Sequence, residues 1–511
     1  EDFIPSIHDA GIIFSQDQAQ KYISAFTKGK TKYHILEILM NYLLPQIGEL
    51  NFKNKAYFLG NMCFQLLKVY KNINKPTDRD NFSYKRVEVT GTLVYDLFKE
   101  YYNLQKKDIF MIIDKDINYN YKNKIDMETV NMKDVFEENY VSYFKNKIVE
   151  KGFKKAFKGN WGATPHTKKV GVLQDLNRLS YLSSLSHLRK ISLPLDESAK
   201  VVGPRLLHNS QWGIIDPVDT PDGGNCGLHK HMTILSNITK GYSGSYMLKW
   251  LRHNMNLILL EETTPSLMYN FTKIFVNGNL IGFLDKLLET VNIMKNYRRL
   301  GVIPAYTSIS FNISENSIFI FTDGGRLCRP LYYIYNDKLS INKNNIDLLK
   351  DATWNNIVSG FHNKSDFHFK DNKFYKIDFL YNSNEYENLK SIIDIVDSSE
   401  SDSTLIASNI TQLKGEKKYS HLEIHPSLLL GVMGNHVIFP EHNQLPRNLF
   451  SCGQSKQACS LFHSNFKNRV DKSGIVLNYG ETPLVKSKYL DLINNEEHAY
   501  GNNTIVAIMA Y

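Results

Sequence analysis

Apolar residues recur at helical spacing through the first 90 residues of the chain. They are clearest in ILEILMNYLLPQIGEL (35–50) and AYFLGNMCFQLLKVYKNI (56–73), so this part is predicted to be mostly helical. The charged residues 76–91 are expected to connect it to another helix at 92–105. One face of that helix is marked by Leu93, Val94, Leu97, Phe98 and Tyr101.

The pattern changes between residues 245 and 335, where short apolar runs predict strands. The turn sequences VNGN and TDGG, each between two such runs, predict hairpins. The acidic, Ser-rich segment DSSESDST (397–404) is predicted to be a disordered surface loop. The final segment NTIVAIMAY (503–511) is predicted to be a buried strand.

Residues 208–228, HNSQWGIIDPVDTPDGGNCGL, favour neither a helix nor a regular strand. They include two Pro, four Gly and three Asp, and TPDGG is typical of turns. A loop of this length must be held by packing or by a partner. Loops built in this way usually carry function.

Length and composition limit the class of protein. The 511 residues exceed what one core accommodates, so about three to five compact units are expected. The net charge of +9 suits contact with nucleic acid without requiring it. Five scattered cysteines with no Cys-x-x-Cys pair predict a reducing compartment without a disulfide framework. No apolar run approaches the roughly 18 residues that span a bilayer.

Between Lys145 and Lys169, eight lysines and several aromatic residues accompany a single acid, Glu150. One interpretation is a solvated amphipathic helix whose lysine stems lie along apolar surface. The other is a surface that faces phosphates. The residues alone favour neither interpretation.

Cys226, His229 and His231, with His208 nearby, are residue types that bind zinc. The first three crowd one short run, in which alternation places Cys226 and His229 on opposite faces. Ordinary half-buried side chains are therefore the favoured interpretation, and no metal site is predicted. The sequence also contains no P-loop, dinucleotide-binding, nucleophile-elbow or HExxH motif.

Three longer motifs succeed one another along the chain: LSHLRK (185–190), residues 204–228, and EIHPSLLLGVMGNHVIFPEHNQLPRN (423–448). Together they resemble the second-largest, β-type subunit of multisubunit DNA-dependent RNA polymerase. DRDNFSYKRVEVTG, FTDGGRLCRPL and YGNNTIVAIMAY also occur in the order that this family shows. The resemblance covers essentially the whole chain, as an internal fragment, and is closer to the eukaryotic, archaeal and large-DNA-virus forms than to the bacterial form.

The resemblance implies an α+β multidomain fold with helical lobe and protrusion parts, a mixed α/β fork and β-rich external domains. The implied parts are the end of the lobe (1–90), a return segment of the protrusion (91–158), the fork (159–245), external domains 1 (246–335) and 2 (336–425), and the start of a β-barrel-like hybrid-binding domain (426–511).

The implied activity is that of a DNA-directed RNA polymerase, in which this subunit lines the active-site cleft. In the family the catalytic Mg²⁺ is bound by the largest subunit, and further functional groups lie beyond Tyr511, so this fragment alone is expected to be inactive. An intein junction or a split gene is expected at that point. Implied partners are the largest and other polymerase subunits, DNA template, RNA–DNA hybrid and NTPs, with no membrane. The implied location is intracellular and reducing: a nucleus, a viral factory or a virion.

A rival interpretation is a non-catalytic nucleic-acid-binding or scaffold fragment derived from a polymerase subunit. The residues encoded after Tyr511 would discriminate between the two, because the missing functional groups must be supplied in the same chain or by another polypeptide. A capsid or cell-entry protein is disfavoured by the order of the motifs.

The resemblance also implies roles for particular residues. Arg447 matches the arginine that contacts the phosphates of the incoming NTP; from the residues alone it would be a surface arginine after a proline turn. Gln457 matches a position that touches the RNA near its 3′ end. The residues implied to border the hybrid are Lys456, Gln174, Asp175, Arg189 and Lys190.

Three residues belong to the implied fork loop: Arg205, Asp219 and Asp222. The family favours Glu at the two acidic positions. Asp is one methylene shorter, so a contact from Asp219 across the cleft is expected to be compromised.

Overall fold

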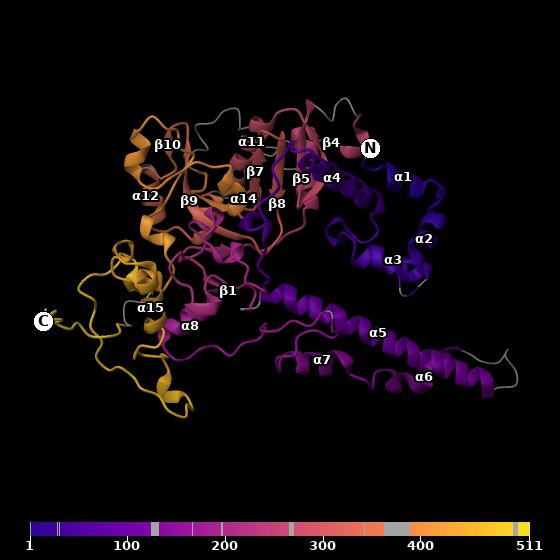
Figure 1. Cartoon of the computed structure of the whole chain (residues 1–511), viewed down its shortest axis with the longest axis horizontal. Helices are drawn as coiled ribbons and strands as arrows, with labels where there is room; N and C mark the ends of the chain where they lie inside the picture. Colours follow the sequence, from indigo (N-terminus) through magenta and orange to yellow (C-terminus); the bar gives the residue numbers. More distant parts are fainter. Residues whose placement is uncertain are drawn as a thin grey trace. The chain divides into compact units, whose positions relative to one another are not determined.

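Each of two structural units is assembled from stretches that are distant in the sequence. The computed structural model describes residues 2–27, 29, 31–123, 132–165, 167–195, 198–264, 270–341, 343–361, 389–493 and 499–510. The first unit comprises Glu1–Tyr84 and Thr239–Pro426, and the second comprises Lys85–Ile238 and Ser427–Tyr511 (Figure 1).

The first unit combines helices with two mixed sheets. Its helices are α1 (Ile4–Ala10), α2 (Gln16–Ala25), α3 (Lys32–Asn41), α4 (Phe52–Tyr70), α9 (Ser245–Met255), α11 (Leu287–Arg299), α12 (Lys343–Leu349), α13 (Trp354–Ser359) and α14 (Ser398–Asp402). Its strands are β4 (Ile258–Leu259), β5 (Thr272–Val276), β6 (Asn279–Leu284), β7 (Ser308–Asn312), β8 (Ser317–Phe321), β9 (Leu327–Tyr335), β10 (Lys338–Leu339), β11 (Ile393–Asp397), β12 (Ile406–Ala407) and β13 (His421–Leu422).

The second unit is mainly helical and irregular. Its helices are α5 (Thr90–Asn123), α6 (Met132–Tyr143), α7 (Ile148–Ala156), α8 (Tyr181–Leu188), α15 (Leu445–Ser455) and α16 (Leu490–Ile493). Strands β1 (Lys190–Ser192) and β2 (His229–His231) form an antiparallel pair. The two units together confirm the predicted α+β multidomain class.

The helices near the start of the chain agree with the hydrophobic pattern. Ser15 begins α2 with a capping box shared with Gln18, and the Thr31 side chain accepts a hydrogen bond at the start of α3. The helix predicted at 92–105 is present but continues as α5 to Asn123. No Pro or Gly interrupts residues 92–123, so nothing in the sequence ends the helix earlier.

One sheet of the first unit has the strand order β4-β6-β5-β8-β7. The VNGN hairpin is confirmed, since β5 and β6 are antiparallel and Asn277 and Gly278 adopt φ of 50° and 80°. Strands β5 and β8 are parallel. The core beside this sheet includes Ile274, Ile309 and Ile318, each 0 % exposed, and side chains of α9 and α11.

The hairpin predicted at TDGG is wrong. β8, before this turn, belongs to the five-stranded sheet, whereas β9, after it, pairs with β10, β11 and β13 in the other sheet. The turn is held by Thr239, whose carbonyl oxygen accepts from the Gly325 N–H at 3.0 Å. The strand-like region 245–335 also contains α9 and α11, so it is not purely β-structure.

The disordered loop predicted at DSSESDST is also wrong. Residues 398–402 form α14, which begins where the Asp397 side chain accepts from the Glu400 N–H. Glu400 is 0 % exposed, and the guanidinium of Arg298 on α11 lies 2.6 and 2.8 Å from its two carboxylate oxygens. A partner about 100 residues away neutralises the acidic segment, and local composition cannot reveal that partner.

The buried strand predicted at NTIVAIMAY is wrong for the residues that are described. Residues 504–510 are exposed and make no strand pairing among the described residues, and Ile505 and Ile508 are 102 % and 96 % exposed. A strand requires a neighbour to pair its backbone groups. The described part of 427–510 contains no strand. No described helix is both long and apolar enough to cross a membrane.

Candidate functional site

The loop of residues 208–228 is held by packing within the second unit. It contains two short 3-10 turns, Asn209–Gln211 and Gly223–Asn225, and is otherwise irregular, as the sequence predicts. Ile214, Ile215 and Val218 anchor it, because they are only 2 %, 2 % and 8 % exposed. The ring of His208 accepts from the Ser210 N–H at 3.1 Å and begins the first turn.

Arg205 fastens the second half of this loop. Its guanidinium donates to the carbonyl oxygens of Gly224, of Cys226 at 3.0 Å and of Ala199 at 3.3 Å. Gly227 has φ of 77°, and a Cβ there would lie 2.2 Å from the carbonyl oxygen of Arg205. Only glycine fits this close approach. Asp222 is exposed at the start of the second turn.

Asp216 joins the loop to the segment that precedes α15. Its Oδ1 accepts from the Val218 N–H at 2.9 Å, and its Oδ2 accepts from the Gly431 N–H at 2.8 Å. A Cβ on Gly431 or Gly434 would lie 2.7 Å from Oδ2, so both glycines permit the contact. Burial, together with the nearby charge of Asp219, raises the pKa of Asp216 to about 6, although the backbone hydrogen bonds oppose this.

Asp219 makes a second connection, to the end of α15. It is 2 % exposed, and its Oδ1 lies 2.8 Å from the Nζ of Lys456. His231 Nδ1 lies 2.9 Å from the Asp219 carbonyl oxygen. Burial lowers the pKa of His231, so the ring is neutral at pH 7 and its Nδ1–H donates to that carbonyl. The Asp219 carboxylate therefore pairs with Lys456 inside the second unit.

Two basic residues follow α8: Arg189, and then Lys190, which is the first residue of β1. The Arg189 guanidinium donates to the carbonyl oxygens of Thr233, Ile234 and Ser236 at 2.6, 3.2 and 3.1 Å. Lys190 pairs with His231 in the register of β1 and β2. Burial and the charge of Lys456 lower the pKa of Lys190, and burial lowers the pKa of Arg189.

Gln174 and Asp175 lie in an exposed run that is tied to α8. The ring of His187 accepts from the Asn177 N–H through Nδ1 at 3.1 Å, which leaves the proton on Nε2. That Nε2–H donates to Gln174 Oε1 at 2.9 Å. The Gln174 amide group in turn donates to the Gly171 carbonyl oxygen at 2.9 Å.

Helix α15 carries Arg447 in its first turn and leads directly to Gln457, and both side chains are exposed. The Arg447 guanidinium lies 5.9 Å from the centre of the Phe450 ring. On the buried face, Asn448 and Cys452 are 4 % and 1 % exposed. The buried face therefore fixes α15, while Arg447 on the helix and Gln457 shortly after it are exposed to solvent.

The N-terminus of α8 also supports the end of α15. Ser180 starts α8 with a capping box and donates through Oγ to the Lys456 carbonyl oxygen at 2.7 Å. The structure thus brings Lys456, Asp219 and Lys190 together, whereas the side chain of Arg189 contacts the backbone of residues 233–236. Arg205 supports the loop, and Gln174, Asp175 and Asp222 lie at exposed positions.

The zinc-type residues have other partners. His229 Nδ1 lies 3.0 Å from Ser192 Oγ, and His208 and His231 hold the backbone as described above. Across the described residues, no group of three or more His, Cys, Asp or Glu is arranged to hold a metal ion. All five cysteines are free thiols.

Comparison with known families matches three parts of the chain. The description "RNA polymerase Rpb2, domain 3" covers residues 174–238, which include α8, β1 and the loop. "RNA polymerase Rpb2, domain 4" covers residues 274–335. "RNA polymerase Rpb2, domain 6" covers residues 433–511, which include α15.

Relatives match along the whole chain. The DNA-directed RNA polymerase II subunit RPB2 of Encephalitozoon cuniculi is 31% identical over 99% of this chain and 42% of its own length. This chain belongs to the family of second-largest RNA polymerase subunits. The RNA polymerase II subunit 2 of Arabidopsis thaliana is also 31% identical, over 99% of this chain and 41% of its own length. Subunit Rpo2 of Sulfolobus acidocaldarius is 26% identical over 100% of this chain and 42% of its own length. The chain thus spans less than half the length of these second-largest subunits.

Sequence reasoning missed the roles of Asp216 and Ser180, and it considered His231 only as a zinc-type residue. Asp216 lies between two isoleucines and a proline, and an acid in such an apolar run indicates burial. Ser180 is the first residue of a Ser-x-x-Ser cap before a Leu-rich run, which was readable as a helix start. The sequence alone does not indicate the tertiary partners of these residues.

Asp216 gives the second unit a distinctive pH dependence. Its folded pKa of about 6 exceeds the ordinary aspartate value of 3.8, so the folded state binds the proton more tightly. The stability that protonation of Asp216 adds to the folded state is fully present below about pH 3.8 and is lost as the pH rises through about 6. Lowering the pH from 7 to 5 should therefore stabilise this core by about 1.4 kcal/mol, or about tenfold in its opening equilibrium.

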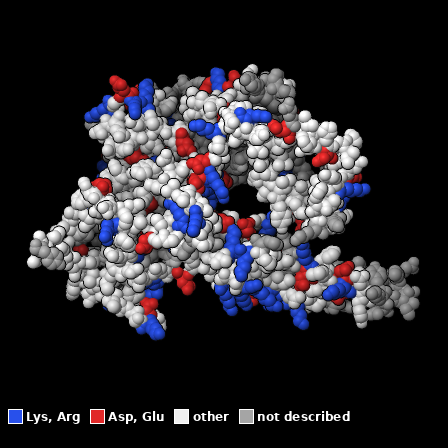
Figure 2. Space-filling view, viewed as in Figure 1, with Lys and Arg blue, Asp and Glu red and all other residues white. Residues whose placement is uncertain are grey.

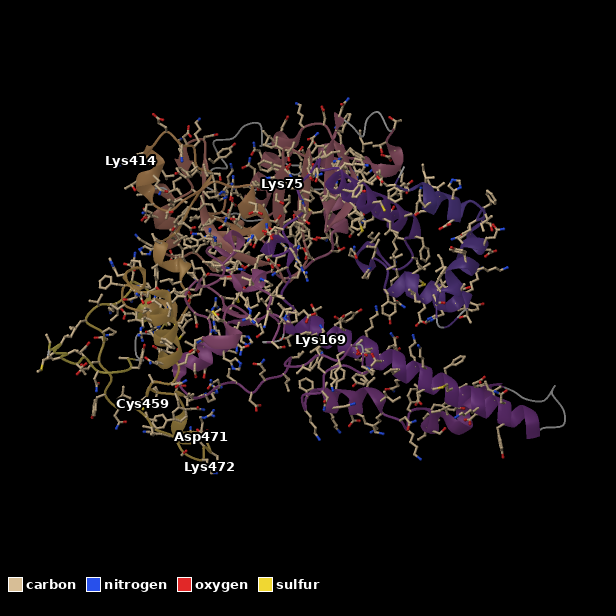
Figure 3. The ribbon with its side chains drawn as sticks, in the orientation of Figure 1. Lys75, Lys169, Lys414, Cys459, Asp471 and Lys472 are labelled. Atoms are coloured by element: carbon tan, nitrogen blue, oxygen red, sulfur yellow. The ribbon has the colours of Figure 1, made fainter. Side chains whose placement is uncertain are left out.

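Thiol labelling of Cys452 would measure this opening, because Cys452 is 1 % exposed in the core that includes Leu182, Val218 and Met433. Labelling rates are corrected at each pH for the rate in denaturant, and exposed Cys459 (Figure 3) serves as the internal reference. Asp216→Asn should abolish the change between pH 7 and 5. Weaker protection at pH 5 in the unaltered protein would contradict the assignment.

Proposed function

We propose that this chain functions as part of a DNA-directed RNA polymerase, where its second unit faces the active-site cleft and contacts the RNA–DNA hybrid and the incoming NTP. The observation that carries the proposal is the support of α15. The buried Asp219 carboxylate pairs with Lys456 at one end of this helix, while Arg447 and Gln457 remain exposed. Family membership supplies the reaction class, and the anchored α15 fixes the backbone from which the Arg447 and Gln457 side chains extend.

Arg447 has the chemistry that phosphate recognition requires. Its guanidinium is permanently charged and presents a planar set of N–H donors that can bind two phosphate oxygens at once. Charge builds on the phosphate oxygens as a nucleotidyl group is transferred, so a preorganised cation stabilises the transition state more than the ground state. Gln457 offers both a donor and an acceptor to the RNA near its 3′ end.

The other predicted residues have supporting roles in the proposal, and these roles differ from one residue to the next. Lys190 adds positive charge near the hybrid, Lys456 borders the hybrid as one half of the ion pair with Asp219, and Arg189 keeps the 233–236 backbone in place through its three carbonyl contacts. Asp219 acts by positioning Lys456. The remaining members of the proposed hybrid-facing and loop surface are Gln174, Asp175, Arg205 and Asp222.

The proposal includes partners outside this chain. The largest subunit would bind the catalytic Mg²⁺, and other polymerase subunits, the DNA template and NTPs would complete the site. The domain assignment from lobe to hybrid-binding domain forms part of the same proposal, as does an intracellular location. Without its partners the chain is expected to lack polymerase activity.

Crosslinking from RNA tests the proposed cleft contacts. A polymerase containing this chain is halted with 4-thiouridine at the RNA 3′ end, irradiated, and analysed by mass spectrometry of its peptides. Crosslinks should fall within residues 445–460, and Gln457→Ala should lower their yield. Halted complexes that extend RNA but never crosslink to these residues would contradict the proposed contact. Complexes that bind the hybrid and never extend RNA would favour a non-catalytic binding role.

A further inference from the structure

One face of α7 and its flanking residues forms a continuous row of lysines. We call it the α7 lysine ridge, and it comprises Lys147, Lys151, Lys154, Lys155 and Lys158. Lys151, Lys154 and Lys155 lie on α7 at a spacing that places them on one side of the helix, and Lys147 and Lys158 flank its two ends. All five are exposed, and the side chains of Lys147 and Lys154 are each 71% exposed.

The opposite face of α7 is packed against α5, which fixes the direction of the ridge. Gly152 and Ala156 are buried, and a Cβ on Gly152 would lie 2.4 Å from the ring of Tyr101 on α5. Gln105 on α5 accepts from the Val149 N–H at 3.2 Å and so holds the first turn of α7. The ridge therefore cannot rotate inward without breaking this packing.

The ridge has a strong positive bias. Glu150 is the one acid among residues 147–158, and it pairs with Lys154 at 2.6 Å and Lys147 at 3.8 Å. Five lysines and one glutamate leave a net charge of +4 on this face. Figure 2 shows Lys and Arg side chains gathered along the lower edge of the view, where Figure 1 draws α7.

Acids near the ridge are engaged with other groups. Glu100 on α5 accepts from the Thr164 N–H at 3.1 Å and from the Thr167 hydroxyl. Glu88 pairs with Lys169, which lies beside the beginning of α5 (Figure 3). These contacts direct both carboxylates toward residues 164–169, so they do not neutralise the ridge directly.

We infer that the α7 lysine ridge binds the phosphate backbone of double-stranded nucleic acid without reading its sequence. The nine residues of α7 span about 13 Å, because a helix rises about 1.5 Å per residue, and Lys147 and Lys158 extend the ridge past its two ends. A duplex presents about one phosphate charge per 1.7 Å of its axis, so phosphates are dense enough to meet every lysine. Lysine is a point charge without planar recognition geometry, which suits backbone contact rather than base readout.

This contact goes beyond the proposed function, since it involves neither Arg447 nor Gln457 and acts on duplex rather than on the RNA 3′ end. It predicts a separable phenotype. Weakening the ridge should reduce duplex retention by the polymerase and leave single-nucleotide addition on a bound template unchanged.

The test measures duplex DNA binding by the intact polymerase containing this chain, by fluorescence anisotropy over a series of salt concentrations. Changing Lys151, Lys155 and Lys158 to Gln should weaken binding about 10- to 100-fold at low salt and reduce the slope of log K against log salt by about 3. The loss should be equal for unrelated DNA sequences. Glu150→Gln should act in the opposite direction, with tighter binding.

The matched control changes Lys414, Lys417 and Lys418 to Gln, which are also exposed and remove the same charge. This control should retain the original salt slope. An unchanged slope in the ridge variant would overturn the inference, as would loss of a protein subunit with DNA affinity intact, which would indicate an acidic protein partner. Loss of nucleotide addition in Arg447→Ala with a normal salt slope would leave the two proposals clearly separate.

Discussion

Arg447→Ala should slow nucleotide addition by about 30- to 1,000-fold in the assembled polymerase. The estimate corresponds to losing about 2–4 kcal/mol of transition-state stabilisation from one charge-assisted contact. Binding of the nucleic-acid scaffold should change little, because Arg447 is proposed to hold the NTP phosphates. Single-turnover incorporation of one nucleotide, measured across NTP concentrations, would separate a lower maximal rate from weaker NTP binding.

Two variants define what the Arg447 result means. Arg447→Lys keeps the charge but loses the planar pair of donors, so we expect an intermediate rate. Arg252→Ala removes an exposed arginine that pairs with Glu262 at 2.7 Å, and it should leave nucleotide addition unchanged. Near-normal incorporation by Arg447→Ala would refute the role of this residue.

The parts of the fold that the sequence predicted are those with local causes. The VNGN turn is one example, because its signal lies within the four residues that form the turn between β5 and β6. TDGG carries similar turn chemistry, yet its outcome depends on Thr239, which lies more than 80 residues earlier. Local patterns thus identified where the chain turns, and they did not identify which sheet each strand joins.

In the candidate site, too, the residues carried by local motifs were predicted and those that depend on distant partners were missed. Arg447 and Gln457 were predicted because sequence motifs carry them, and both are exposed on or directly after α15. Asp216 was missed because its importance arises from Gly431, which is 215 residues away and allows the carboxylate to reach a backbone N–H. The supports of this site are long-range contacts, so single-sequence reasoning finds the presented residues more readily than their scaffold.

A buried charge network in the first unit shows the strongest long-range effect. Arg298 on α11 is 1 % exposed and binds both carboxylate oxygens of Glu400 on α14. Lys295 adds a contact of 3.2 Å to Glu400, and Arg299 binds Asp394 at 2.7 Å. Burial alone would raise the pKa of Glu400, but the charges of Arg298 and Lys295 lower it to about 2. The folded pKa of Glu400 is below the ordinary glutamate value of 4.5. The stability that the ionised Glu400 adds to the folded state is therefore present above about pH 4.5 and is lost as the pH falls through about 2.

Arg298→Met should destabilise the first unit by about 3–5 kcal/mol, because Glu400 would keep its burial and lose its main counter-charge. For a unit of this size the expected fall in melting temperature is roughly 6–20 °C, measurable by thermal unfolding of the intact protein. The matched control is Lys286→Met, since the Lys286–Glu289 pair is 69% and 55% exposed, and it should change stability by less than about 1 kcal/mol.

The double variant Arg298→Met with Glu400→Leu distinguishes the cost of an orphaned charge from the value of the pair itself. Removing both charges replaces a desolvated ion pair with apolar side chains, which is often neutral or stabilising, so the double variant should recover most of the loss. A double variant as unstable as Arg298→Met would show instead that the geometry of the pair holds α14 on α11. A small loss in Arg298→Met alone would mean that Lys295 suffices to neutralise Glu400, and the network would then have little effect on stability.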